Sequence, residues 1–201
     1  MLAIIDYDAG NIKSVEKAFQ FLGQDVCVTR NPEEIYRAHR VVLPGVGAFG
    51  DAMQKINEYG LTEVIHKVCD SQTPFLGICL GLQLLFESSE ESEGAVGLCV
   101  LEGKIKKIPD NGGIKIPQIG WNDLKYPSEG RLFKGIDEGS FVYFVHSYYL
   151  DATDKQIVKA QTEYGTTIDA SVEKDNVFAC QFHPEKSSEV GMEILNNFLH
   201  I

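Results

Sequence analysis

The stretch Pro74-Phe75-Leu76-Gly77-Ile78-Cys79-Leu80-Gly81 decides how this chain of 201 residues folds. The apolar residues 74–78 predict a buried strand, because the run is short and bounded by turn-forming sequence. The apolar residues that follow predict a helix to about residue 87, so the strand leads directly into a helix. Strands of this kind, apolar on both sides, lie in parallel sheets that are covered on both faces.

The sequence before this stretch repeats the same order of strand and helix. Short apolar runs predict strands at residues 2–5, 25–29 and 40–43. Apolar residues at helical spacing predict helices from residue 11, at 51–59 and at 61–70. The first half therefore favours a mainly parallel α/β sheet with helices on both faces.

After Gly94 the pattern changes to short β segments, which end in a final helix from about residue 188. Turn sequences such as Asp110-Asn111-Gly112-Gly113 separate them, and the predicted segments are residues 97–108, 117–124, 140–150, 156–162, 167–172 and 177–182. No repeat or linker divides the chain. We therefore expect a single domain, residues 1–201, with a mixed, mainly parallel central sheet and a β-rich elaboration.

The charge balance excludes several classes of partner. Lys and Arg number 18 against 29 Asp and Glu, a net charge of −11, so we expect no binding to nucleic acid or to an anionic membrane. The longest apolar stretch, residues 74–86, is shorter than the roughly 20 residues of a membrane-spanning helix. Residues 1–6 lack the basic start of a signal peptide, which favours a cytoplasmic location. The five cysteines contain no C-x-x-C pair, so we expect neither a metal site nor another cofactor.

Gly77-Ile78-Cys79-Leu80-Gly81 has the form of the G-x-S-x-G nucleophile elbow, with cysteine in place of serine. The glycines suit a turn so tight that other side chains would collide there. Cys79 would stand at a helix N-terminus, where the helix dipole stabilises negative charge on sulfur. The alternative is a structural cysteine buried in a strand–helix turn.

Phe182-His183-Pro184-Glu185 is the second candidate for chemistry. If Pro184 holds this segment extended, residues 183 and 185 point to the same side with Cβ atoms roughly 7 Å apart. The carboxylate could then fix the imidazole tautomer while the other ring nitrogen faces a nucleophile. An isolated H-x-E in a solvated surface loop is the alternative, and the separate elbow cysteine makes it less convincing.

The third candidate is the loop Pro44-Gly45-Val46-Gly47-Ala48-Phe49-Gly50, which follows a strand and precedes a helix. Its glycines satisfy G-x-G-x-x-G, the dinucleotide-binding pattern. Pro44 removes a backbone donor, however, and no strand-end acid follows at the expected distance. A glycine-rich backbone can equally present N–H groups to a developing oxyanion, so both interpretations remain open at this point.

Together the three motifs resemble the oxyanion loop, nucleophile elbow and His-x-Glu motif of the triad-type (class I) glutamine amidotransferases, in the same order along the whole chain. Further stretches resemble the family's glutaminase subunits of imidazole glycerol phosphate synthase, which serve histidine biosynthesis. These are Asp6-Tyr7 with Gly10-Asn11, Gly120-Trp121-Asn122, residues 143–148 and residues 183–188. One departure is that Gln118-Ile119 precedes Gly-Trp-Asn, where the pattern has a histidine.

The resemblance implies that Cys79, His183 and Glu185 form a triad that hydrolyses glutamine through a thioester. It implies an oxyanion hole that involves Val46 and Leu80, and a glutamine pocket lined by Gly47, Gln83, Glu91, Ser147 and Tyr148. It also implies a (β/α)₈ cyclase subunit as partner, which receives the ammonia. Our candidates for the face toward that partner are Asn11, Trp121, Asn122, Tyr143 and Lys186.

Overall fold

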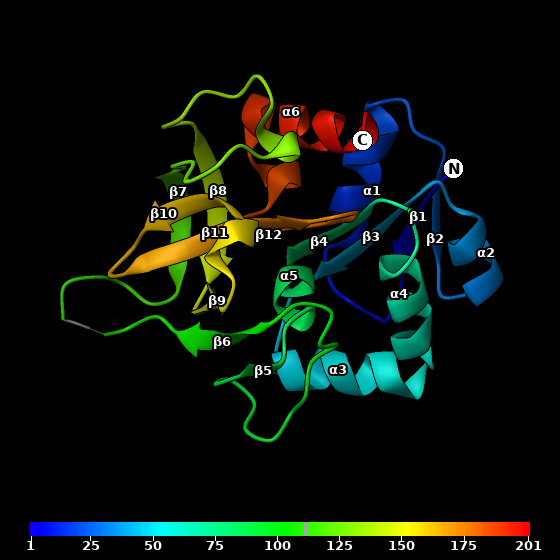
Figure 1. Cartoon of the computed structure of the whole chain (residues 1–201), viewed down its shortest axis with the longest axis horizontal. Coiled ribbons are helices and arrows are strands. Elements are labelled where there is room, and N and C mark those ends of the chain that lie inside the picture. Colours follow the sequence, from blue (N-terminus) through cyan, green and yellow to red (C-terminus); the bar gives the residue numbers. More distant parts are fainter. Residues whose placement is uncertain (111) are drawn as a thin grey trace.

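A seven-stranded sheet forms the centre of the computed structural model, which describes residues 1–110 and 112–201 (Figure 1). Its strand order is β10-β11-β12-β4-β3-β1-β2, and all neighbours from β12 to β2 are parallel while β10 and β11 are antiparallel additions. The strands are β1 (Leu2–Ile5), β2 (Val26–Thr29), β3 (Arg40–Gly45), β4 (Phe75–Cys79), β10 (Val158–Glu163), β11 (Thr167–Lys174) and β12 (Val177–Cys180). The predicted mixed, mainly parallel sheet is confirmed.

Helices cover both faces of this sheet (Figure 1). One face holds α1 (Ile12–Phe21) and α6 (Ser188–Leu199); the other holds α2 (Pro32–Arg37), α3 (Phe49–Glu58), α4 (Leu61–Cys69) and α5 (Leu80–Leu84). Successive residues of β1 enter different cores, because side chains alternate across a strand. Leu2 and Ile4 pack with α1 and α6, whereas Ala3 and Ile5 pack with the other four helices.

Two smaller sheets make up the β-rich elaboration. One contains β5 (Ser88–Ser89), β6 (Gly103–Lys107) and β9 (Tyr148–Ala152), and the other pairs β7 (Gln118–Asp123) with β8 (Phe141–His146). The segment predicted at 140–150 is thus two strands in different sheets, separated at Ser147. Helix α2 and strand β5 are not predicted by the apolar pattern, and α5 ends earlier than expected. The predicted turn at Asp110–Gly113 includes Asn111, which lies outside the described residues.

The parallel strands place several loops along one edge of the sheet. Strands β12, β4, β3 and β1 are neighbours, so the segments that follow their carboxyl ends meet there. This is the edge at which open α/β sheets bind ligands. Within the part of the chain that the structure describes, no helix is long and apolar enough to cross a membrane.

Candidate active site

The turn at Cys79 has the backbone of a nucleophile elbow. Cys79 lies between β4 and α5 with φ 55° and ψ −107°, a strained conformation for a residue with a side chain. A Cβ on Gly77 would lie 2.7 Å from the Gly81 carbonyl oxygen, and one on Gly81 would lie 1.9 Å from that of Leu43. Only glycine fits at both positions, as the sequence pattern predicts.

His183 links the cysteine to Glu185. Its Nδ1 lies 2.8 Å from Glu185 Oε1, and the two side chains are 3% and 0% exposed. Burial lowers the pKa of His183, but hydrogen bonds and charge interactions with Cys79 and Glu185 outweigh it and raise that pKa to about 10. The imidazole is therefore protonated at neutral pH, with its Nδ1–H directed at the Glu185 carboxylate and its other N–H at the Cys79 sulfur.

The backbone at this motif differs from the prediction. Residues Pro184–Lys186 form a 3₁₀ turn and not an extended segment. The turn brings the Glu185 carboxylate back onto the imidazole, which is the contact that the sequence predicts by another route. Asn11, at the start of α1, adds a second hydrogen bond by donating from Nδ2 to Glu185 Oε1 at 2.6 Å.

A cavity of about 260 Å³ opens in front of Cys79 and His183. This volume suits a single small molecule, since drug-sized ligands occupy roughly 300–1,000 Å³. The predicted oxyanion and glutamine residues all line it, together with one residue predicted to face the partner: Val46, Gly47, Leu80, Gln83, Glu91, Ser147, Tyr148 and Lys186. The other lining residues, which the motifs did not single out for the site, are Pro117, Val145 and His146.

Two histidines of this cavity have opposite environments. Both ring nitrogens of His146 are occupied within the protein: Nδ1 donates to the Tyr148 carbonyl at 2.9 Å, and Nε2 lies 2.8 Å from the side-chain amide of Gln118, whose NH₂ group donates to it in the neutral ring. Burial lowers the pKa of His146 to about 4, so its ring is neutral. Gln118, where the family pattern has a histidine, is thus a buried partner of His146 on the inner face of β7.

The loop after β3 has one fixed end and one open end. Tyr7 donates a hydrogen bond from its hydroxyl to the Pro44 carbonyl at 2.8 Å, and a Cβ on Gly45 would lie 2.3 Å from that hydroxyl. Gly47 has φ +102° and open space around it, and Val46 beside it is 39% exposed. Adjustment of this loop is therefore confined to Val46 and Gly47.

The start of the helix that follows this loop, α3, contradicts the dinucleotide-binding interpretation. Phosphates in such sites bind the free N–H groups of the helix N-terminus. Here the N–H of Phe49 donates to Glu91 Oε2 at 2.8 Å, and that of Gly50 donates to Ser92 Oγ at 2.9 Å. Side chains of the protein already occupy these donors, which leaves the loop to serve the cavity at Cys79.

The family model for class-I glutamine amidotransferases matches residues 3–201. The chain belongs to the class-I glutamine amidotransferases. It is 52% identical, over 98% of its length and 93% of the relative's, to the imidazole glycerol phosphate synthase subunit HisH of Bacillus cereus (strain G9842). It is 50% identical, over the same shares, to the protein of that name from Moorella thermoacetica.

Solved structures support the amidotransferase fold. A crystal structure titled as a glutamine amidotransferase superposes with a TM-score of 0.76 and 19% identity, covering 98% of this chain and 97% of the other. PurLQS from Thermotoga maritima gives 0.75 and 18%, with coverage of 99% and 97%. At these identities the likeness shows the fold alone.

One buried residue beside Cys79, Gln181, is not among the residues that the sequence motifs predict for the site. Gln181 is 0% exposed, and its Nε2 lies 3.7 Å from Cys79 Sγ. Its place two residues before His183, at the end of an apolar strand, was the available signal, because strand side chains at i and i+2 share a face.

The outer face of the β7–β8 pair carries exposed aromatic and aliphatic side chains. Trp121 is 50% exposed and meets Tyr143 edge to face at 5.9 Å, and Ile119 and Phe141 are 63% and 56% exposed on the same face. We call Ile119, Trp121, Phe141 and Tyr143 the hairpin face. Asn122 points the other way and donates to the Glu163 carbonyl at 3.0 Å, so it lies apart from this face.

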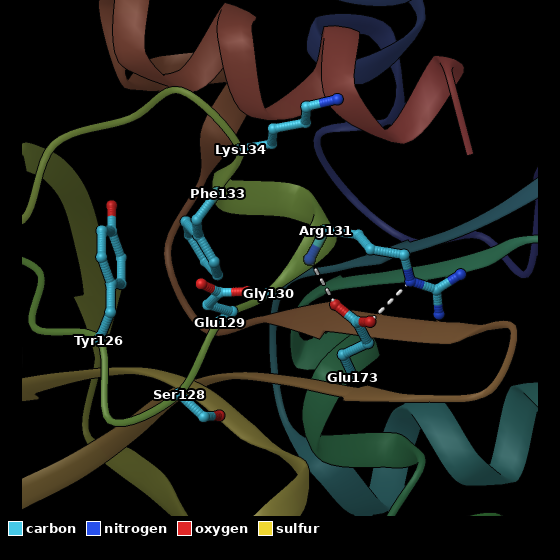
Figure 2. A pocket seen from close by; sticks show the side chains of 8 residues that line it. All are labelled: Tyr126, Ser128, Glu129, Gly130, Arg131, Phe133, Lys134 and Glu173. Atoms are coloured by element: carbon cyan, nitrogen blue, oxygen red, sulfur yellow. Dashed lines mark hydrogen bonds and ion pairs between the residues drawn. The ribbon is translucent and has the colours of Figure 1, made fainter.

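A larger hollow of this amidotransferase surface lies away from Cys79. It measures about 840 Å³ and is drawn in Figure 2, which shows Arg131 turned toward Glu173. The backbone N–H and Nε of Arg131 donate to that carboxylate at 2.7 and 2.6 Å. The described residues that line the hollow include no cysteine or histidine, so the chemistry belongs to the smaller cavity.

Proposed function

We propose that this chain is the glutaminase subunit of an imidazole glycerol phosphate synthase, with Cys79, His183 and Glu185 as its triad. The observation that carries the proposal is His183, held between the Cys79 sulfur and the Glu185 carboxylate at the floor of a cavity sized for one small molecule. Residues 1–201 act as one amidotransferase unit in the cytoplasm.

The reaction begins when the Cys79 thiolate attacks the side-chain amide carbon of glutamine. Backbone N–H groups of Leu80 and of the loop at Val46 receive the oxyanion, and the protonated His183 gives its proton to the departing nitrogen so that ammonia leaves. Water, activated by the same imidazole, then hydrolyses the thioester to glutamate. Glu185 keeps the imidazole in the tautomer that both steps require.

The relatives at 52% and 50% identity are named as subunits, which supports a partner for this chain as well. A (β/α)₈ cyclase subunit is the proposed partner, and the hairpin face suits it because exposed aromatic side chains are typical of binding surfaces. The backbone of β8 also reaches the triad, since the N–H of His183 donates to the Tyr143 carbonyl at 2.9 Å. Ammonia must pass within the complex, because ammonium in water is not a nucleophile.

The open end of the oxyanion loop provides a means of control. Glutamine would be wasted if the subunit worked without its partner. Gly47 has open space around it, so a peptide group there can turn toward the cavity. We propose that it does so only when the complex is loaded. Asn11, a candidate residue for the face toward the partner, donates to Glu185 and gives a second connection to the triad.

Glutamate release tests the proposal. The purified chain should release little glutamate alone and much more with the cyclase subunit and its nucleotide substrate, and Cys79→Ala should release none. Trp121→Ala should weaken partner binding about 30-fold, as the loss of a central aromatic does, while the far-face variant Asn122→Ala changes it less. Full activity of the isolated chain would instead indicate an independent hydrolase.

A further inference from the structure

A chain of side-chain amides runs from the backbone of β9 to the sulfur of Cys79. Gln83 Nε2 lies 3.0 Å from the Tyr148 carbonyl oxygen and 3.0 Å from Gln181 Oε1. Gln181 Nε2 in turn lies 3.7 Å from Cys79 Sγ. Both glutamines are buried, at 5% and 0% exposure.

The direction of this chain is fixed by its first member. A backbone carbonyl can only accept, so the atom of Gln83 that faces Tyr148 is the nitrogen. The second hydrogen of that nitrogen goes to Gln181, which therefore presents its oxygen to Gln83 and its NH₂ group to the sulfur. Gln181 is thus oriented as a donor toward Cys79, and its alternative amide orientation would lose the bond to Gln83.

Most of the other groups around the Cys79 sulfur cannot stabilise negative charge on it. Tyr7 and Cys180 interact with Cys79 electrostatically, and burial raises the pKa of both, so they are neutral at pH 7. The Val145 carbonyl, 3.9 Å from Sγ, accepts a hydrogen bond from a thiol and offers a thiolate nothing. Among the described side chains at this sulfur, His183 and Gln181 are the ones that stabilise negative charge on it.

These two groups differ during the reaction. His183 gives its proton to the leaving nitrogen, so its positive charge is spent when the thioester forms. Gln181 has no proton to lose and donates throughout. When water attacks the thioester, the carbon–sulfur bond breaks and its electron pair returns to Sγ, where the Gln181 N–H is still in place.

We propose that the side-chain amide of Gln181 is a further catalytic group, a fixed hydrogen-bond donor that stabilises the Cys79 thiolate before attack and again as it leaves the thioester. Gln83 acts through it as a positioning residue. The proposal rests on Cys79 being the nucleophile, as set out above, but it does not depend on the partner or on the pathway.

Alkylation of Cys79 by iodoacetamide tests this without substrate. Cys79 is buried but lines the cavity, and the modified peptide is followed by mass spectrometry because the exposed Cys99 reacts too. Gln181→Met removes the donor at similar length. We expect alkylation at pH 7 to slow about tenfold, the pH of half-maximal rate to rise, and kcat for glutamate release to fall with little change in KM. Gln118→Met is the matched control, since Gln118 is a buried amide at 3% exposure that bonds His146.

Gln181→Glu is a second variant, with a side chain of the same shape. It places a carboxylate oxygen where the amide N–H faced the sulfur, so alkylation of Cys79 should slow further. An unchanged pH profile in both variants, or an equal shift in Gln118→Met, would overturn the proposal. Normal wild-type alkylation without glutamate release even in the loaded complex would overturn the proposed function and the role of Gln181 in thioester hydrolysis, whereas a slowed alkylation in Gln181→Met would still support its role toward the thiolate.

Discussion

Two glycine-containing turns stand at neighbouring strand ends, and they are built differently. The turn after β4 is packed so closely that a Cβ on Gly81 would lie 1.9 Å from a backbone oxygen of β3. The loop after β3 has a fixed start at Gly45 and then an open part, where a Cβ on Gly47 would touch nothing within 4 Å. The first turn carries the proposed nucleophile and the Leu80 N–H, and the second carries the other proposed oxyanion donor, at Val46.

The difference indicates which parts of catalysis are preorganised. The sulfur and the imidazole are held by buried contacts, so the nucleophile is ready at all times. The proposed oxyanion donor at Val46 lies on the open part of the loop, so a partner could complete the site there without moving the triad. Variants of the fixed part should therefore damage the protein or its chemistry severely, and variants of the open part should change activity mildly.

The largest effect is expected on the fixed side, at Glu185→Gln. The amide can no longer hold the imidazole in the required tautomer or stabilise its charge, so glutamate release in the loaded complex should fall about 10³-fold or more. Steady-state kinetics measure this, with circular dichroism to confirm folding. A loss of less than tenfold would mean that burial and the contact with Cys79 keep His183 in place without the carboxylate.

Gly81→Ala should come next. Its methyl group meets the Leu43 carbonyl, which belongs to the central sheet and cannot yield, so the free energy of unfolding should drop by about 3 kcal/mol or more. Urea denaturation gives the value. A near-normal stability would contradict the close packing of the elbow.

The positive charge on His183 makes the stability of the folded protein depend on pH in the alkaline range. Its pKa is raised from 6.5 to about 10 in the folded protein, so the stabilisation is complete below pH 6.5 and is lost as the pH rises toward 10. We expect the free energy of unfolding to fall by more than about 1 kcal/mol over that interval. Cys79→Ala removes one of the groups that raise this pKa, so its decline should be smaller, and equal declines would argue against the pairing.

The smallest effect on stability is expected at Gly47→Ala, about 1 kcal/mol or less, because the loop has room to relax to a negative φ. Activity in the complex should change instead, since the peptide groups around Val46 would turn with it. Gly23→Ala is the matched control, as Gly23 also has positive φ and open space but lies at the end of α1, outside the cavity. Equal kinetics in the two variants would remove the open loop from the mechanism.

Much of this site follows from the sequence because its motifs are local. The elbow is recognisable because both of its glycines lie within two residues of Cys79, although the atom that requires glycine at position 81 is the Leu43 carbonyl oxygen of β3. His183 and Glu185 are likewise near neighbours, so the contact was predictable even though the backbone between them turns and is not extended. The family assignment that rests on these motifs is confirmed by the comparison over residues 3–201.

The contacts that escaped prediction join distant parts of the chain. Asn11 and Glu185 are separated by 174 residues, and Gln181 and Cys79 by 102. Nothing in the local pattern shows which strand ends become neighbours, and the sheet order that decides this arises from packing. The same holds for the split of residues 140–150 at Ser147, since both halves read as one β run.

The position of β12 has a consequence for how the protein is made. This strand comes from the last part of the chain, yet it lies in the middle of the sheet between β11 and β4. A ribosome that has not yet released residues 177–185 has produced a nucleophile with no base and a sheet that lacks an interior strand. With the triad proposed above, a nascent or truncated chain cannot consume glutamine, and its unpaired β4 edge is open to pairing with other chains.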